Sequence, residues 1–298
     1  MSTCTLIVNP SSGGEKATGY LGLMKTQLSR MFEEVIVKET EKQGDAVSFA
    51  QEAASQGHEA VFCMGGDGTV NETINGLASA GKNVSFGFVP LGTVNDLARA
   101  IGIPLDPDQA ISMLATASLI DLDIGKVNDR YFVSNVAAGA IPEAVEEVSV
   151  EDKTKYGPLA YFIEAGKALV NQTVYRFHFT VDGETFTQES PLILISMTNS
   201  IASFESFMPQ AKVDDGKMRL LVFKEFNLLE SLKLLPQLIR GEIKNSDSVI
   251  YTSFKQATIS VEDGDRLITN VDGDEGPVFP IEIEILPSFI KVYGPAAT

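Results

Sequence analysis

The first part of the chain alternates between short apolar runs and longer segments with helical spacing. The apolar runs have the length and composition of buried strands: CTLIV, EVIVKE, AVFCM and SFGFV. Between them, apolar residues recur at helical spacing near residues 15–32, in DAVSFAQEAAS, which is closed by Gly57, and in a segment that starts at Thr69. This order of strands and helices predicts a mostly parallel sheet with helices on both faces.

From about Asp121 the pattern changes to the two-residue period of β-strands joined by short polar turns. IGKV and RYFVSNV flank Asn128–Asp129, and YRFHFTV and ETFTQ flank Asp182–Gly183, so both pairs are predicted to be hairpins. Further strands are predicted at LILISMT, MRLLVF, ATISVE and IEIEIL, with helical segments at 157–170 and 228–239. We therefore expect an antiparallel, β-rich, sandwich-like second lobe.

The chain is long enough for two lobes, since it has 298 residues and one domain usually has about 100–200. We predict an α/β fold of two domains. The first is an α/β domain over residues 1–122, to which the last strand, FIKVYGP, returns at about 288–298; the second is a β-rich domain over 123–287. Ligands of parallel sheets bind at the carboxyl ends of the strands, so the loops that follow the first-lobe strands are the candidates for chemistry.

The charge and composition exclude several classes of protein. A formal net charge of −17 without a Lys/Arg cluster argues against nucleic acid as a partner and against electrostatic docking on anionic lipid. No apolar run is long enough to cross a bilayer, and the first residues lack the pattern of a signal peptide, so we expect a cytoplasmic protein. Cys4 and Cys63 lie in apolar runs, where buried free thiols are expected. His58 and His178 offer no support for a His-based hydrolase or metal site.

The segment GGDGTVNETINGL, which follows AVFCM, is the most informative stretch of the sequence. Gly65, Gly66 and Gly68 would let backbone amides and a helix N-terminus approach a phosphate closely. Asp67 could face a nucleotide or its metal, and Thr69 or Asn71 could donate to a phosphate oxygen. The alternative is a tight strand-to-helix turn without a ligand. The segment is neither a dinucleotide fingerprint nor a Walker loop, and the protein-kinase signatures are absent.

Two further loops repeat this arrangement of strand end, turn and helix. In VPLGTVNDLARAIGIP a helix is expected to begin near Thr93, and Thr93 and Asn95 could bind a nucleotide. In IVNPSSGG the polar groups are Asn9, the serines that follow it and the glycine amides, although a generic turn is an equally good interpretation.

Two acidic segments in the second part have the composition of polar turns. AKVDDGKM could also present carboxylate and carbonyl oxygens to a hard cation, whereas NVDGDEGP invites a turn interpretation. By themselves, both patterns are common hairpin turns.

Taken in order, NPSSG, GGDGTVNETINGL and PLGTVNDLAR resemble the diacylglycerol kinase catalytic family, which also includes sphingosine and ceramide kinases. The resemblance spans nearly the whole chain. The chain is most similar to the soluble bacterial diacylglycerol kinases at four places: Asp123 and Gly125, GPLAY, the TNS that begins at Thr198, and AKVDDGKM. The resemblance implies an ATP- and Mg²⁺-dependent lipid kinase that phosphorylates the hydroxyl of diacylglycerol to phosphatidic acid.

The same resemblance implies roles for particular residues. The positions that would bind ATP are Asn9, Pro10, Ser11, Ser12, Gly13, Thr40, Gly65, Gly66, Asp67, Gly68, Thr69, Val70, Asn71 and Thr93. For Thr40, a solvated cap is an equally good interpretation. The carbonyls of Lys212 and Lys217 and the carboxylate of Asp215 would hold a structural Mg²⁺, away from the reacting phosphate.

The catalytic base is implied at the position where related kinases have a DGE-like sequence. This chain has Asp274 there instead of Glu, so either Asp274 is the base, which we favour, or Glu275 takes its place. Asp123 is similar to an aspartate that organises metal and water in these enzymes, although a strand-end turn is the alternative. Lys153 and Lys155 could contact phosphate, but lysines in loops are usually only solvated.

The partner implied is a lipid substrate met at the inner face of the membrane by transient peripheral contact, without a transmembrane segment. Phe204, Phe207 and Met208 could face the membrane, but a core position is the commoner place for such residues. A homodimer is possible, because β-rich lobes with exposed edges often pair. Alternatives left open are another lipid alcohol (a sphingoid base, ceramide or phosphatidylglycerol), a soluble acceptor such as NAD, and a silent nucleotide- or lipid-binding regulator.

Overall fold

The computed structural model describes residues 2–15, 17–81, 84–139, 173–200, 211–224, 237, 242–262 and 267–296. Several predictions therefore lie outside the described residues. These are the helical segments at 157–170 and, apart from Gln237, at 228–239, together with Lys153, Lys155, Phe204, Phe207 and Met208.

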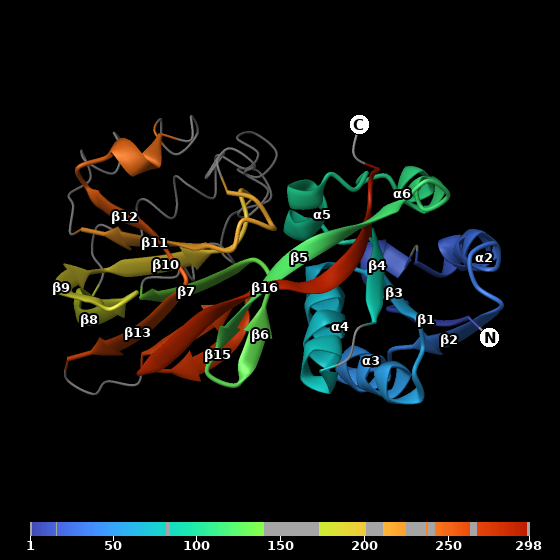
Figure 1. Ribbon diagram of the computed structural model, residues 1–298, viewed down its shortest axis with the longest axis horizontal. Helices are drawn as coiled ribbons and strands as arrows, with labels where there is room; N and C mark the ends of the chain where they lie inside the picture. Colours follow the sequence, from blue (N-terminus) through green and yellow to red (C-terminus); the bar gives the residue numbers. More distant parts are fainter. Residues whose placement is uncertain are drawn as a thin grey trace.

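The N-terminal lobe has the predicted parallel sheet. Four strands pair in the order β2-β1-β3-β4: β1 (Thr3–Val8), β2 (Glu34–Glu39), β3 (Ala60–Gly65) and β4 (Ser85–Pro90). Two helices pack together on one face, α3 (Asp45–Gln56) and α4 (Asp67–Ala80), and two others cover the opposite face, α2 (Ala17–Leu28) and α6 (Pro107–Met113) (Figure 1). The short helices α1 (Ser12–Glu15) and α5 (Asp96–Ile101) lie in the loops that follow β1 and β4.

Helix α4 packs closely against α3 because position 76 is a glycine. A Cβ at this position would overlap the carbonyl oxygen of Val47 and approach the Ala50 side chain to 2.8 Å. The glycine in TINGL therefore allows the two helices to touch, which fixes the direction of the helix that begins at Asp67.

The C-terminal lobe is built from two antiparallel layers. One continues the first sheet, through β5 (Ser118–Val127), β6 (Arg130–Phe132), β8 (Tyr175–Val181), β9 (Glu184–Ser190), β13 (Gln256–Val261) and β16 (Ile281–Gly294). The other has the order β12-β11-β10-β7-β14-β15, with β7 (Asn135–Gly139), β10 (Leu192–Ser196), β11 (Met218–Phe223), β12 (Val249–Phe254), β14 (Ile268–Val271) and β15 (Asp274–Val278). A short 3₁₀ helix spans Ile243–Asn245.

A second hydrophobic core fills the space between these layers, with side chains such as Phe177, Phe179 and Phe254. The hairpins predicted at Asn128–Asp129 and Asp182–Gly183 are both present. The α/β two-lobed fold is thereby confirmed, with a mostly parallel first sheet and a sandwich-like second lobe.

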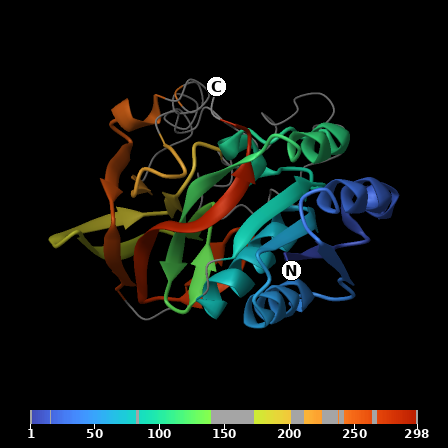
Figure 2. The same cartoon turned by 45° about the vertical axis from the view of Figure 1, so that its right-hand side comes forward.

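Strand β16 joins the two lobes and differs from the prediction. IEIEIL and FIKVYG are one strand, not two, with a register shift between Leu286 and Ile290 and Ser288 at φ 50°. Its first half pairs with β13, Val292 pairs with Phe86 of β4, and β5 runs beside it through both lobes (Figures 1 and 2). The predicted division at residues 122 and 288 stays a prediction.

The segment RYFVSNV was expected to be one strand and is two. It breaks after Phe132, and β7 enters the other sheet. The cause is the carboxylate of Asp272, which accepts the N–H groups of Val133, Ser134 and Asn135. A side chain distant in the sequence thus takes the donors that a continuous strand would use.

Candidate active site

The carboxyl ends of the four parallel strands bring the predicted loops to one edge of the sheet. Asn9 N donates to Met64 O (3.0 Å), which joins the loops after β1 and β3. On one side Thr40 N donates to Val8 O (2.9 Å), and on the other Leu91 N donates to Gly65 O (2.8 Å).

Asn9 connects the first loop to the start of helix α4. Its Nδ2 donates to Thr69 Oγ1 (3.1 Å), and its Oδ1 accepts from both N (3.1 Å) and Oγ (2.8 Å) of Ser11. The polar groups predicted to hold a nucleotide therefore brace one another between the two loops.

The glycines of the second and third loops approach each other through their backbones. A Cβ on Gly66 would lie 3.1 Å from Gly92 Cα, and a Cβ on Gly92 would lie 2.9 Å from Gly66 Cα. A Cβ on Gly65 would overlap the side chain of Thr69. Side chains are thus excluded where the two loops meet, so the backbones of the two loops lie directly against each other.

Asp67 ties these loops together at the N-terminus of α4. Its Oδ2 accepts from Asn95 N (2.9 Å) and its Oδ1 from Asp96 N (3.0 Å). Asn95 is left-handed, with φ 54°, and its Oδ1 accepts from Gly92 N (2.9 Å). This geometry places the start of α5 at Asp96, three residues later than the helix expected near Thr93.

The other predicted nucleotide positions fall into two groups. Val70 and Asn71 are buried in α4, and Asn71 Oδ1 accepts from Asn75 Nδ2 (2.7 Å), so these side chains support the helix. Exposed or half-buried positions at the same edge are Pro10, Ser12, Gly13, Gly68 and Thr93.

A hydrogen-bonded path leads from the glycine loops into the second lobe. Ser200 Oγ donates to Asp96 Oδ1 (2.5 Å), and Thr198 Oγ1 donates to Ser200 O (2.9 Å). Met197 N then donates to Ser134 O (2.9 Å). The TNS segment therefore bridges the two lobes.

The path ends at the turn that carries the predicted base. Asp272 (φ 51°) and Gly273 (φ 95°) form a two-residue hairpin turn between β14 and β15. Asp272 accepts from the N–H groups of Val133 (2.8 Å), Ser134 (2.9 Å) and Asn135 (2.8 Å). Burial raises the pKa of the Asp272 carboxyl to about 6, although these three donors and the nearby Arg130 act in the opposite direction.

Arg130 holds both sides of the same turn. Its Nη2 lies 3.1 Å from Asp274 Oδ2 and 3.3 Å from Val271 O, and its Nη1 donates to Glu275 O (2.6 Å). Asp274 therefore has an oriented carboxylate. Glu275 follows it on β15 and is exposed.

Asp123 connects the predicted metal loop to strand β16. It is 2% exposed; its Oδ2 accepts from Gly216 N (2.7 Å) and its Oδ1 from Ser288 N (2.8 Å). Its own N–H donates to Val213 O (2.8 Å). Asp123 thus organises the loop directly through backbone donors.

The ligand set predicted for a structural Mg²⁺ does not fit that ion in this chain. Each oxygen of Asp215 accepts two hydrogen bonds, one from a backbone N–H (Lys212 or Lys217) and one from the guanidinium of Arg219. A carboxylate has about four lone-pair positions, so all of them are used. Arg219 also donates to Lys217 O (2.8 Å), a second predicted ligand.

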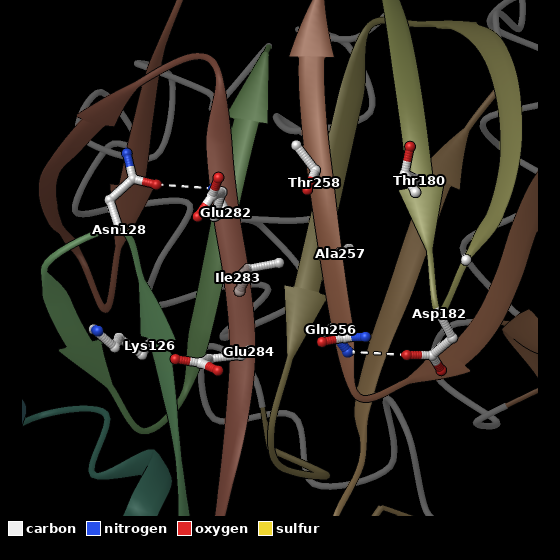
Figure 3. A pocket seen from close by; sticks show the side chains of 11 residues that line it. Lys126, Asn128, Thr180, Asp182, Gln256, Ala257, Thr258, Glu282, Ile283 and Glu284 are labelled. Atoms are coloured by element: carbon white, nitrogen blue, oxygen red, sulfur yellow. Dashed lines mark hydrogen bonds between the residues drawn. The ribbon is translucent and has the colours of Figure 1, made fainter.

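A hollow of about 400 Å³ opens elsewhere, on the solvent face of the sandwich. Figure 3 shows it between β5, β16, β13 and β8, and none of its lining residues is a predicted site residue. Two of its polar side chains serve turns, since Asn128 accepts from Glu282 N (2.8 Å) and Asp182 from Gln256 N (3.0 Å). The candidate active site is therefore the edge of the sheet where the glycine loops meet, and not this hollow.

Sequence reasoning missed several residues that organise the site. Asp96 and Ser200 lie within PLGTVNDLAR and TNS, but nothing local indicates that they meet across 104 residues. The same is true of the contacts made by Arg130 and by Asp272. A signal was present for Arg219, because it is the charged residue of the apolar run MRLLVF.

Comparisons with known proteins match this architecture. Residues 3–127 match the diacylglycerol kinase catalytic domain, and residues 134–294 match the YegS C-terminal NAD kinase beta sandwich-like domain. A diacylglycerol kinase of Staphylococcus carnosus (strain TM300) is 35% identical over 290 residues, which are 97% of this chain and 94% of that protein. A diacylglycerol kinase of Bacillus subtilis (strain 168) is 33% identical over 296 residues, which are 99% of this chain and 97% of that protein.

A solved structure has the same fold over the full length. The crystal structure of a diacylglycerol kinase from Bacillus anthracis str. Sterne gives a TM-score of 0.82 at 26% identity, and the match covers 100% of this chain and 99% of that one. In the part of the chain that the structure describes, none of the helices combines the length and the apolar character needed to cross a membrane. The resemblance noted in the sequence is therefore confirmed: the chain belongs to the diacylglycerol kinase family and is a lipid kinase.

Proposed function

We propose that this lipid kinase transfers the γ-phosphate of ATP, bound with Mg²⁺, to the hydroxyl of diacylglycerol and so produces phosphatidic acid. The observation that carries the proposal is the close approach of Gly66 and Gly92 beside Asp67, connected by hydrogen bonds through Asp96 and Ser200 to the turn of Asp274. The names of the relatives support diacylglycerol as the acceptor.

The nucleotide phosphates would bind to the backbone amides at the start of helix α4, beside the place where the glycine loops meet. The N-terminus of α4 points its free N–H groups toward this edge, and a Cβ at Gly66 or Gly92 would close the space. Asn9, Thr40, Thr69 and Thr93 would complete the nucleotide site. The Asp67 carboxylate would hold the Mg²⁺ that accompanies ATP, and this ion would offset the charge on the phosphoryl oxygens.

Asp274 would accept the proton of the lipid hydroxyl. The hydroxyl oxygen forms a bond to the γ-phosphorus, the bond from this phosphorus to the bridging oxygen of ADP breaks, and the proton moves to the Asp274 carboxylate. Arg130 orients this carboxylate at 3.1 Å. Glu275, which has only its carbonyl bound by Arg130, is the alternative base.

The enzyme would meet its lipid at the membrane surface by peripheral contact. A net charge of −17 disfavours attraction to anionic lipid, so the contact would be apolar and local. A cytoplasmic location and a homodimer stay predictions.

The test is transfer of labelled γ-phosphate from ATP with Mg²⁺ to diacylglycerol in mixed micelles. Parallel assays offer sphingosine, ceramide, phosphatidylglycerol and NAD. Wild type is compared with Asp274→Asn and with Glu275→Gln, its neighbour on the same strand, and urea unfolding confirms that each variant is folded.

We expect labelled phosphatidic acid with wild type and Glu275→Gln, and a loss of at least about 100-fold with Asp274→Asn, in the range for removal of a general base. Loss in Glu275→Gln alone would move the base to Glu275. Label on a different acceptor would change the substrate, and no label on any acceptor would refute the proposed reaction.

A further inference from the structure

Strand β11 contains a charge where the fold buries every residue. All six residues of MRLLVF are buried, and Arg219 is 4% exposed. It lies between Ser196 of β10 and Ser253 of β12 in the sheet register. An arginine keeps its proton in proteins, so a buried one needs an anionic partner and acceptors for its N–H groups.

The partner of Arg219 is the loop just before its own strand. Nη1 lies 3.1 Å from Asp215 Oδ1, Nη2 contacts Asp215 Oδ2, and Nη1 also donates to Lys217 O (2.8 Å). The guanidinium is therefore bidentate on the carboxylate and closes the loop onto its carbonyl. The side chain of Asp215 is 23% exposed and that of Arg219 is 5% exposed, so solvent screens this pair only weakly.

These are the contacts that a cation bound to the loop would make. A structural Mg²⁺ held by the Asp215 carboxylate and the Lys217 carbonyl would be surrounded by the same oxygens. The Arg219 guanidinium and a Mg²⁺ ion cannot bind these oxygens at the same time. The four lone-pair positions of Asp215 are already used, and the charge of the metal ion would repel the guanidinium. Within the described residues, no group of three or more His, Cys, Asp or Glu side chains is arranged to hold a metal ion.

We propose that Arg219 supplies, from within the chain, the positive charge that a structural Mg²⁺ would supply to the loop of residues 211–218. The loop then keeps its shape without a divalent cation. The contact between this loop and β16 also needs no cation, because the Asp123 carboxylate accepts hydrogen bonds from Gly216 N (2.7 Å) and Ser288 N (2.8 Å). The inference does not depend on the proposed lipid reaction, and it concerns only this loop, not the Mg²⁺ that accompanies ATP.

The test is thermal unfolding of the full chain without nucleotide, in EDTA and in a series of MgCl₂ concentrations. Four variants are compared with wild type: Arg219→Gln, Arg219→Lys, Asp215→Asn and the double variant Arg219→Gln/Asp215→Asn. Arg176→Gln is the matched control, since Arg176 also pairs with a carboxylate (Glu262, 3.3 Å) but is exposed on the sandwich.

We expect wild type and Arg176→Gln to have the same Tm in EDTA and in Mg²⁺. Arg219→Gln should have a Tm lower by several degrees in EDTA, and Mg²⁺ should restore part of it saturably, because Asp215 and the Lys217 carbonyl are then free to bind the ion. The Tm of Arg219→Lys should lie near that of wild type and rise only slightly with Mg²⁺. The double variant should lose the response to Mg²⁺.

Three results would overturn the proposal. One is a saturable rise of the wild-type Tm with Mg²⁺ that Asp215→Asn abolishes. The second is a Tm of Arg219→Gln in EDTA equal to that of wild type. The third is a Tm of Arg219→Gln that is lower than that of wild type in EDTA and does not rise with Mg²⁺. If Arg219→Gln does not fold, calorimetric titration of Mg²⁺ into wild type decides: absence of binding that depends on Asp215 supports the proposal, and its presence overturns it.

Discussion

The side-chain amide of Asn75 makes two reciprocal hydrogen bonds with the backbone of Tyr131. Nδ2 donates to Tyr131 O (3.0 Å), and Oδ1 accepts from Tyr131 N (3.0 Å). Asn75 belongs to α4, which begins at Asp67, and Tyr131 follows Arg130, which binds the carboxylate of Asp274. The helix of the proposed nucleotide site and the turn of the proposed base are thus joined through one strand.

Replacing Asn75 by Ala should separate catalysis from nucleotide binding. The N-terminus of α4 stays intact, so KM for ATP should change little. The position of Asp274 should loosen, so kcat should fall about 10- to 100-fold, the effect of a small misplacement. Ser79→Ala, one turn further along the exposed side of α4, is the control in steady-state kinetics. An unchanged kcat, or a loss confined to KM for ATP, would show that the Asn75 contact does not position the base.

Arg130→Gln should lower kcat because the turn loses its bonds to Val271, Asp274 and Glu275 together. We expect a loss of about tenfold or more, with Arg130→Lys in between, since lysine keeps the charge but lacks the planar fork of donors. The measurement is kcat at saturating ATP and lipid. Wild-type activity in both variants would show that neither the charge nor the fork geometry of Arg130 matters here.

Gly92→Ala should damage the nucleotide site. The new Cβ would lie 2.8 Å from Asn95 Oδ1 and 2.9 Å from Gly66 Cα, so the two loops must move apart. We expect a free energy of unfolding lower by about 1–3 kcal/mol and a KM for ATP higher by about tenfold, the effect of about 1.4 kcal/mol of lost binding.

Gly68→Ala is the matched control for this prediction. A Cβ at Gly68 meets no atom within 4 Å, so the free protein should be as stable as wild type. If ATP binding by calorimetry nevertheless falls in Gly68→Ala, the nucleotide lies over the first turn of α4. Unchanged binding in both variants would place the nucleotide elsewhere.

Asp272 should make stability depend on pH in a defined direction. Its pKa in the folded protein is about 6, above the 3.8 of an unperturbed carboxyl. Between about pH 4 and pH 6 the folded chain therefore binds a proton that the unfolded chain releases, so this residue adds stability as the pH falls and the contribution is lost as the pH rises through 6. From pH 7.5 to pH 4.5 the change amounts to about 2 kcal/mol.

The comparison with Asp272→Asn isolates this effect from the other carboxylates. Urea unfolding gives the free energy of unfolding of each protein. The value for Asp272→Asn minus the value for wild type should be larger at pH 7.5 than at pH 4.5. The wild-type kcat should also fall below about pH 6, since a protonated, uncharged Asp272 accepts more weakly from the three backbone N–H groups that hold the turn. A stability difference that is equal at both pH values would contradict the prediction.

Much of the fold could be predicted because its signals are local. The apolar period separates strand from helix within a few residues, and the turns at Asn128–Asp129 and Asp182–Gly183 have residues suited to left-handed backbone. The glycine loops after β3 and β4 were recognisable for the same reason. Cys4 and Cys63 are buried and free, as their apolar runs indicated.

The partners of the site residues were decided by the tertiary structure. The sequence by itself determined the alternation of strands and helices in the first sheet, the glycine loops and the family, but α6, β12 and β14 were not predicted. It did not determine that Asp272 divides RYFVSNV into two strands, that Asp96 meets Ser200, or that Arg219 occupies the acceptors of Asp215. Those contacts depend on how two sheets and their loops pack, and a hydrogen bond between distant residues leaves no periodicity in the chain.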